Sequence, residues 1–314
     1  MGWVRASIVA AAGLLFAILY PDTLLGRQAT QPFVGVTYSV RTVKEPRPLT
    51  MHVAQVDLEA PGIHFKVSPP DGDREVVRQS TLEFLKQEHA QLAINAHYFL
   101  PFPSEDHTAW VIGLAASEGR LFSAFESPEQ SFALVADAPA INIDGLNHAT
   151  LIHNNRAFID GRHVREDVTP WNVVAGSSQI VTAGAITVPV YRDDQHPTGL
   201  LANGGPNKYS NANAWADATT ARTAIGLSAD RRTLTLFTVD ARGGSAGMKL
   251  SEVAAVLIRD FGVADALNLD GGGSTTMAME NANHAPAIVN VSSDNPTGRV
   301  VATSLAVFAQ RRER

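Results

Sequence analysis

Two aspartates and a run of three glycines are the residues of this sequence best suited to chemistry. Asp240 and Asp270 each follow an apolar stretch, and Asp270 is followed by Gly271, Gly272 and Gly273. Of two carboxylates, one can stabilise or attack an electrophilic carbon while the other handles a proton. Glycines let backbone N–H groups approach a phosphate or a sugar, and Ser274 and Thr275 add hydroxyl donors.

Two arginines stand near these residues and suit the binding of an anion. Arg222 precedes an apolar stretch and Arg242 comes two residues after Asp240. A guanidinium can hold an anion through two parallel hydrogen bonds. However, arginines that flank a strand usually pair with neighbouring aspartates, and a strand-end aspartate is more often a turn or helix-cap acceptor. A Gly-Gly-Gly run is most often a turn, so residue types leave structural and catalytic interpretations open.

The elements that would position these residues can be predicted from hydrophobic patterns. Residues 223–227, 233–240 and 264–269 have patterns typical of strands. Residues 250–261 have apolar side chains on one face, which predicts an amphipathic helix with Ser251 as its N-cap and Gly262 as its stop. Arg222, Asp240 and Asp270 would then lie at strand ends, and we expect the topology to bring them together.

Earlier in the chain, residues 31–67 alternate polar and apolar side chains, which predicts strands. Ser80 followed by Glu83 is typical of a capping box and predicts a short helix at 80–87. A further apolar stretch at 92–94 predicts a strand.

That strand ends at Asn95 and His97, where a loop begins, and such positions often carry function. The polar stretch at 198–220 predicts a long surface loop that could act as a lid or binding loop. No linker divides residues 30–314. The sequence therefore predicts one α+β domain with a mixed, mostly antiparallel sheet and few helices.

Composition excludes several classes of function. The chain has no cysteine, which excludes disulfides, thiolate nucleophiles and zinc sites built from cysteine. Its net charge is -6 and it has no long basic run, so we expect no nucleic-acid partner. The histidine spacing fits no metal site and no motif predicts a cofactor. The oligomeric state stays open.

The N-terminus has the composition of an export segment. Arg5 precedes residues 6–21, which are uncharged and apolar. As a helix they would reach only about 24 Å, short of a hydrocarbon core of about 30 Å. We therefore interpret residues 1–28 as a signal peptide or a signal anchor, with possible membrane anchoring through residues 6–21, rather than as a buried helix. The body of the protein would then be periplasmic or secreted.

Several segments, in this order, resemble one enzyme family. They are Arg-Thr-Ala-Ile-Gly-Leu at 222–227, Thr-Val-Asp-Ala-Arg at 238–242, Gly-Met-Lys-Leu-Ser-Glu-Val-Ala at 247–254 and Ala-Leu-Asn-Leu-Asp-Gly-Gly-Gly-Ser-Thr-Thr-Met at 266–277. Together they resemble the phosphodiester glycosidase family. Residues 94–99 and 299–302 resemble its upstream and closing elements, so that the resemblance spans roughly 92–308.

The resemblance implies a glycosidase that acts on a sugar joined through phosphate, in a cell-surface glycan or exopolysaccharide. It assigns the carboxylate roles to Asp270 and Asp240. Phosphate or fold-supporting contacts would come from Arg222, Arg242 and Arg299. Substrate contacts would come from Asn95, His97, Gly271, Gly272, Gly273, Ser274 and Thr275.

One departure from the family concerns His97. Ala96 and His97 stand where the family usually has two glycines, which narrows that space. His97 could contact substrate or could be a hydrogen-bonded structural residue. Two other functions stay open for the chain: hydrolysis of an ordinary glycosidic bond in a polysaccharide, and glycan binding or polysaccharide export without catalysis.

Overall fold

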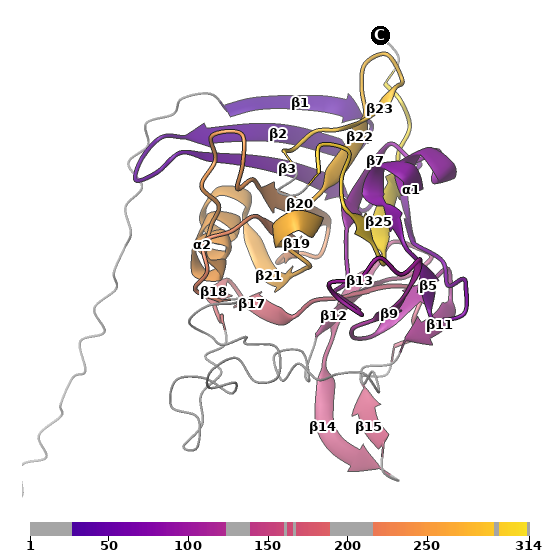
Figure 1. Ribbon diagram of the computed structural model, residues 1–314. Coiled ribbons are helices and arrows are strands. Elements are labelled where there is room, and N and C mark those ends of the chain that lie inside the picture. Colours follow the sequence, from indigo (N-terminus) through magenta and orange to yellow (C-terminus); the bar gives the residue numbers. More distant parts are fainter. Residues whose placement is uncertain are drawn as a thin grey trace, which may run out of the picture.

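Antiparallel strands dominate the computed structural model, which describes residues 27–123, 139–159, 162–165, 168–188, 216–291 and 295–312 (Figure 1). The first 26 residues of the predicted export segment and most of the predicted loop at 198–220 lie outside the described residues. In the part of the chain that is described, no helix is long and apolar enough to cross a membrane.

The largest element is an eight-stranded sheet in the order β1-β2-β3-β20-β19-β21-β17-β18. Its N-terminal strands confirm the strands expected from residue 31 onward, although β1 already begins at Arg27. The bounds are β1 Arg27–Phe33, β2 Val36–Val43, β3 Leu49–Asp57, β17 Ser178–Thr182, β18 Ala185–Ile186, β19 Arg222–Ser228, β20 Thr233–Val239 and β21 Val263–Asn268.

A second, five-stranded sheet packs against one face of the first, in the order β23-β22-β7-β25-β4. Because side chains alternate between the two faces of a strand, each sheet contributes every second residue to the core between them. Ile225 and Leu236 from the first sheet meet Ile94 and Leu305 from the second there. The bounds are β4 His64–Val67, β7 Leu92–Asn95, β22 Met277–Glu280, β23 Pro286–Ile288 and β25 Ser304–Phe308.

Two α-helices cover the outer faces of these sheets. Helix α2, Leu250–Phe261, packs on the eight-stranded sheet, and α1, Thr81–Glu88, packs on the five-stranded sheet. The two helices lie on opposite sides of the molecule in Figure 1, with the sheets between them. The layers therefore run helix, sheet, sheet, helix.

The helix ends follow local sequence signals. The Ser80 hydroxyl accepts from the backbone N–H of Glu83, whose carboxylate accepts from that of Ser80, so the predicted capping box is confirmed. Gly262, at φ +65°, ends α2 as predicted. Ser251 is not the N-cap of α2, because the helix begins one residue earlier and Glu252 accepts from the backbone N–H of Lys249.

A third sheet has the order β11-β10-β16-β12-β13, and shorter ladders join the rest. The bounds in the third sheet are β10 Ala115–Ser117, β11 Arg120–Ser123, β12 Ala140–Ile143, β13 Ala149–Ile152 and β16 Asn172–Ala175. The shorter strands are β5 Val76–Val77, β6 Gln79–Ser80, β8 Phe99–Leu100, β9 Thr108–Val111, β14 Asn154–Ile159, β15 Arg162–Arg165 and β24 Val300–Val301.

The predicted fold class is confirmed: one α+β domain, mostly antiparallel sheet, few helices. Among the described strands every pairing is antiparallel.

Candidate active site

The glycine-rich loop after β21 crosses the start of β19 and joins the two large sheets. The backbone N–H of Asp270 donates to the carbonyl of Ala96 at 3.0 Å, and that of Gly272 donates to the carbonyl of Ala221 at 2.8 Å. A Cβ added at Gly271 would lie 2.9 Å from that same carbonyl oxygen, and Gly272 has a φ of +57°. Glycine is therefore required here by the path of the backbone. Substrate contacts by Gly271, Gly272 and Gly273 stay a prediction.

The Asp270 carboxyl group is only 8% exposed. Burial raises its pKa to about 7, although a hydrogen bond from Ser274, the charge of Arg299 and a hydrogen bond from the Gly271 backbone act in the opposite direction. A carboxyl group in this environment exists in both protonation states near neutral pH. That property is typical of acids and bases in active sites.

Arg299 is the arginine that the fold places beside Asp270. One guanidinium nitrogen lies 3.4 Å from the Ser274 hydroxyl oxygen. Partial burial lowers the pKa of Arg299, and the negative charge of Asp270 raises it. The guanidinium also lies 4.9 Å from the centre of the Phe102 ring, a side chain that is 40% exposed. Asp270, Ser274 and Arg299 therefore form a compact group with an exposed aromatic side chain at its edge.

Asn95 holds the Asp270 loop from the end of β7. Its amide nitrogen donates to the carbonyl oxygen of Asp270 at 2.6 Å. Its amide oxygen accepts from the Thr223 hydroxyl at 2.9 Å and from the backbone N–H of Thr276 at 3.0 Å. Asn95 is fully buried and joins both large sheets to the loop. This geometry gives Asn95 a positioning role, and its predicted contact with substrate stays a prediction.

Tyr98 belongs to this group of residues and was missed by sequence reasoning. Its hydroxyl accepts from the amide nitrogen of Asn268 at 2.9 Å. Burial and then the charge of Asp270 raise the pKa of Tyr98, whereas Arg222 lowers it. The only signal in the sequence was its place three residues after Asn95, at a strand end.

His97 is fully enclosed, at 0% exposure. Its Nδ1 lies 2.7 Å from the Thr303 hydroxyl, and its Nε2 lies 2.9 Å from the backbone nitrogen of Ala175 and 3.1 Å from the carbonyl oxygen of Leu114. Burial lowers the pKa of His97 to about 4. Both ring nitrogens therefore have partners within the protein. The geometry favours the structural alternative, and contact with substrate stays a prediction.

Arg222 and Asp240 lie on opposite faces of the eight-stranded sheet and do not converge as expected, whereas Arg222 does lie beside the Asp270 loop, with its Cδ 3.9 Å from a Cβ built at Gly271. Arg222, which is 1% exposed, donates to the carbonyls of Met248 and Ala218 on the face covered by α2. Its strand partner is Val239, and Asp240 comes next in the chain. Because neighbouring residues in a strand face opposite sides, the Asp240 carboxylate lies toward the second sheet. The geometry of Arg222 favours the fold-supporting alternative.

The remaining predicted residues have fewer contacts with this group. Arg242 is exposed in the turn after β20, and the described residues give its side chain no hydrogen bond or ion pair. The Thr275 hydroxyl is buried, and it has no hydrogen-bond partner among the residues that the structure describes. Substrate binding by Arg242 and Thr275 stays a prediction. Within the same described ranges, no three histidines or carboxylates gather in a way that could hold a metal ion.

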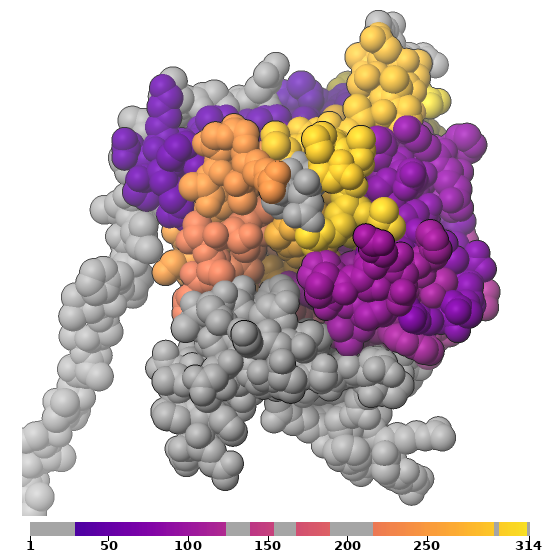
Figure 2. Space-filling model, viewed as in Figure 1, coloured from indigo at the N-terminus to yellow at the C-terminus, as the bar shows by residue number. Residues whose placement is uncertain are grey.

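Three segments from distant parts of the chain meet on the face of the molecule seen in Figure 2. Figure 2 shows the yellow segment 295–303 between the orange segment 240–260 and the purple segment near residue 100. Phe102 and Arg299, which contact each other, come from the purple and the yellow segment.

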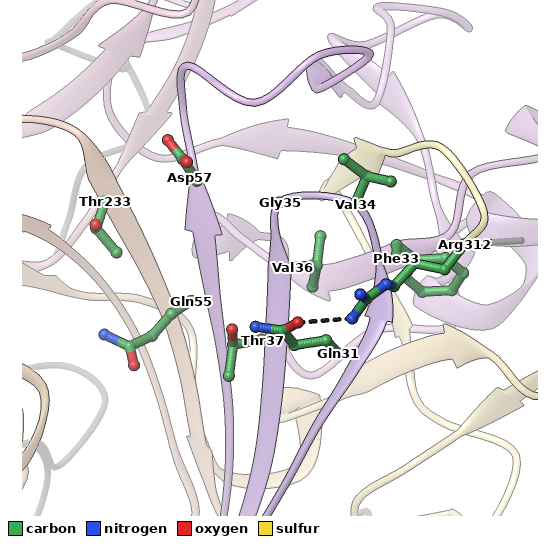
Figure 3. Close-up of a pocket in the computed structure, with 10 residues that line it drawn as sticks. All are labelled: Gln31, Phe33, Val34, Gly35, Val36, Thr37, Gln55, Asp57, Thr233 and Arg312. Atoms are coloured by element: carbon green, nitrogen blue, oxygen red, sulfur yellow. Dashed lines mark hydrogen bonds between the residues drawn. The ribbon is translucent and has the colours of Figure 1, made fainter.

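A separate groove of about 530 Å³ lies at the far end of the eight-stranded sheet. In Figure 3, Gln31 and Arg312 lie at one end of it, joined by a 2.6 Å hydrogen bond, and Asp57 and Thr233 at the other. Thr233 begins β20, whereas the glycine-rich loop crosses the start of β19, which pairs with the end of β20. Seven residues of strand separate these ends by roughly 20 Å. The groove is therefore not part of the candidate active site.

Comparisons with known proteins agree with this architecture. A family profile described as phosphodiester glycosidase matches residues 88–308. No match was found among curated proteins.

Several solved structures share the fold. The catalytic domain of zebrafish N-acetylglucosamine-1-phosphodiester alpha-N-acetylglucosaminidase, auto-inhibited by its pro-peptide, matches with a TM-score of 0.60 and 19% identity over 90% of this chain and 86% of that one. A Synechocystis protein matches with a TM-score of 0.58 and 14% identity over 88% of this chain, which spans 62% of that protein. A Burkholderia pseudomallei protein matches with a TM-score of 0.55 and 16% identity, over 83% and 74% of the two chains. At these identities the structures show the fold alone.

Proposed function

Because the chain belongs to the phosphodiester glycosidase family, we propose that it is an enzyme that hydrolyses a sugar-1-phosphodiester. Water would add to the anomeric carbon, and the bond from that carbon to the bridging oxygen would break. The products are a free sugar and a phosphate monoester that keeps the bridging oxygen, with release of one proton. A phosphate monoester leaves more readily than an alcohol, so recognition of the anion matters more here than strong acid assistance.

The single observation that carries this proposal is the buried Asp270 carboxyl group, whose pKa is raised to about 7. As an acid it can protonate the bridging oxygen, and as a base it can take a proton from water. Its environment, with Ser274 and Arg299 close by, provides hydrogen bonds and a positive charge where a phosphate would need them. Of the three predicted arginines, Arg299 is therefore the one we assign to the phosphate.

A screen of sugar-1-phosphodiesters, with detection of both the free sugar and the phosphate monoester, tests this proposal. The parent protein would be measured beside Asp270→Asn and beside Glu59→Gln, which changes an exposed glutamate in the turn after β3, away from the site. Loss of a general acid or base costs about 10²- to 10⁴-fold in rate. If Asp270→Asn stays within about threefold of the parent, a barrier change below about 1 kcal/mol, Asp270 does not carry the chemistry.

The same screen separates the two other functions. Turnover of a neutral alkyl or aryl glycoside, with no preference for a phosphodiester, would indicate an ordinary glycoside hydrolase. Binding of glycan without turnover, unaffected by replacing Asp240 or Asp270, would indicate a non-catalytic glycan-binding protein.

We also propose that the protein acts outside the cytoplasm on a cell-surface glycan or exopolysaccharide. The support is the apolar, uncharged stretch of residues 6–21 after Arg5. Fractionation of cells that produce the full chain would test it, with a variant lacking residues 1–26 as the control. Equal amounts of the two proteins in the cytoplasm would contradict export.

A further inference from the structure

A row of polar side chains runs from the partly buried Tyr38 on β2 through the buried His52 to the buried Asp240. The Tyr38 hydroxyl lies 2.7 Å from Nδ1 of His52 on β3. Nε2 of His52 lies 3.3 Å from one carboxylate oxygen of Asp240. Tyr38 and His52 both precede residues 88–308, the part of the chain that matches the family profile. Strands outside the matched segment therefore contribute to the surroundings of Asp240.

The Tyr38 hydroxyl is the hydrogen-bond donor at one end of this row of side chains. Burial and then the negative charge of Asp240 raise the pKa of Tyr38, so that its phenol keeps its proton. The phenol can therefore donate to Nδ1 of His52. When Nδ1 of His52 accepts from the phenol, the ring carries a proton on Nε2, the nitrogen that faces Asp240. The contact of Nε2 with Asp240 is a close electrostatic approach rather than a well-aligned hydrogen bond.

The other carboxylate oxygen of Asp240 holds two segments that lead to the candidate active site. It accepts from the side-chain amide of Asn290 at 3.2 Å and from the backbone N–H of Val291 at 3.1 Å. Asn290 also donates to the carbonyl of Thr275 at 3.1 Å and accepts from the backbone N–H of Met277 at 2.7 Å. Thr275 directly follows Ser274, and the chain continues from Val291 toward Arg299.

We propose that Asp240 is a positioning residue, oriented by Tyr38 and His52, that fixes through Asn290 the segments carrying Ser274 and Arg299. Asp240 is 1% exposed, and its second oxygen is enclosed facing His52, so almost none of the carboxylate is open to solvent. Among the described residues, Asp240 and Asp270 share no side-chain partner. The effect on turnover rests on the proposed function, whereas the effect on local structure does not.

Comparison of Asp240→Asn with Asp240→Ala tests this role by activity. The amide oxygen of asparagine can still accept from Asn290 and Val291, and His52 can move its proton to Nδ1 and accept from the new NH2 group. We therefore expect Asp240→Asn to keep kcat within about tenfold of the parent, with an unchanged pH profile, and Asp240→Ala to lose substantially more. A loss in Asp240→Asn as large as that in Asp270→Asn, in a folded protein, would make Asp240 a reacting carboxylate and overturn the proposal.

Hydrogen–deuterium exchange tests the same role without any turnover. We expect peptides covering residues 275–277 and 288–291 to exchange at least about tenfold faster in Asp240→Ala than in the parent, and faster in the milder Tyr38→Phe variant. The matched control is Asp144→Ala, which breaks an exposed aspartate–histidine pair with His148 in the third sheet.

Unchanged exchange at both peptides in Asp240→Ala, or equal acceleration in Asp144→Ala, would overturn the proposal. If Asp240→Ala does not fold, unchanged exchange in Tyr38→Phe would overturn it equally. If the parent turns over no sugar phosphodiester, the proposed function fails, and the exchange result still decides whether Asp240 positions the two segments.

Discussion

Replacement of Asp270 by asparagine should stabilise the protein above neutral pH while it removes activity. The carboxyl group is buried, and its pKa rises from the ordinary 3.8 to about 7 in the folded protein. Each unit of difference between the pKa in the folded state and the pKa in the unfolded state corresponds to about 1.36 kcal/mol. The ionised carboxylate should therefore destabilise the folded state by up to about 4 kcal/mol. An active-site group that lowers stability is a common cost of function.

The sign of the effect fixes its pH window. Below about pH 3 the carboxyl group is protonated in both the folded and the unfolded state and contributes almost nothing. Between about pH 4 and pH 7 the folded state binds more protons than the unfolded state, so the free energy of unfolding falls as the pH rises. Above about pH 7 the full penalty is present. Asparagine is neutral throughout and resembles the protonated acid in shape.

Urea unfolding of the parent and of Asp270→Asn at pH 4.5, 6 and 8 measures this difference. We expect the advantage of the variant in free energy of unfolding to grow from about 1 kcal/mol at pH 4.5 to about 4 kcal/mol at pH 8. Glu59→Gln, at an exposed position, is the control and should track the parent at all three pH values. A difference that does not change with pH, or a more stable parent at pH 8, would refute the reasoning.

Three further predictions follow from the structure. Arg299→Gln should lower kcat/KM for a sugar phosphodiester about 10- to 100-fold, and kcat/KM for a neutral aryl glycoside of the same sugar much less. The same comparison with Arg242→Gln tests the phosphate contact predicted for Arg242. For either arginine, equal losses on both substrates would show that it does not recognise the phosphate. Ser80→Ala removes the hydroxyl that accepts from Glu83 and should lower the free energy of unfolding by about 1 kcal/mol in urea titrations; no measurable change would mean that the cap is not needed. Removal of residues 1–26, which precede β1, should leave an active protein with an unchanged Tm, and a Tm lower by more than about 5 °C would show that they pack on the domain.

Local patterns in the sequence determined the elements and several of their ends. The capping box of Ser80 and Glu83, the stop at Gly262 and the strand before Asp270 were all predicted from residues close to one another in the chain. Such signals act over a few residues, because hydrogen bonds at helix ends and the periodicity of helices and strands are local. The family was also predictable, because its motifs are contiguous segments.

Only the tertiary structure decided which of these residues meet. Arg222 and Asp240 were expected together because both lie at strand ends, yet the register of β19 with β20 places them on opposite faces. A shift of one residue in strand register exchanges the two faces, and the register depends on partners far away in the chain. Two further contacts depend on how strands from distant parts of the chain pair and pack: that of Arg299 with Ser274 and that of His52 with Asp240. The pattern of any one segment does not encode this pairing.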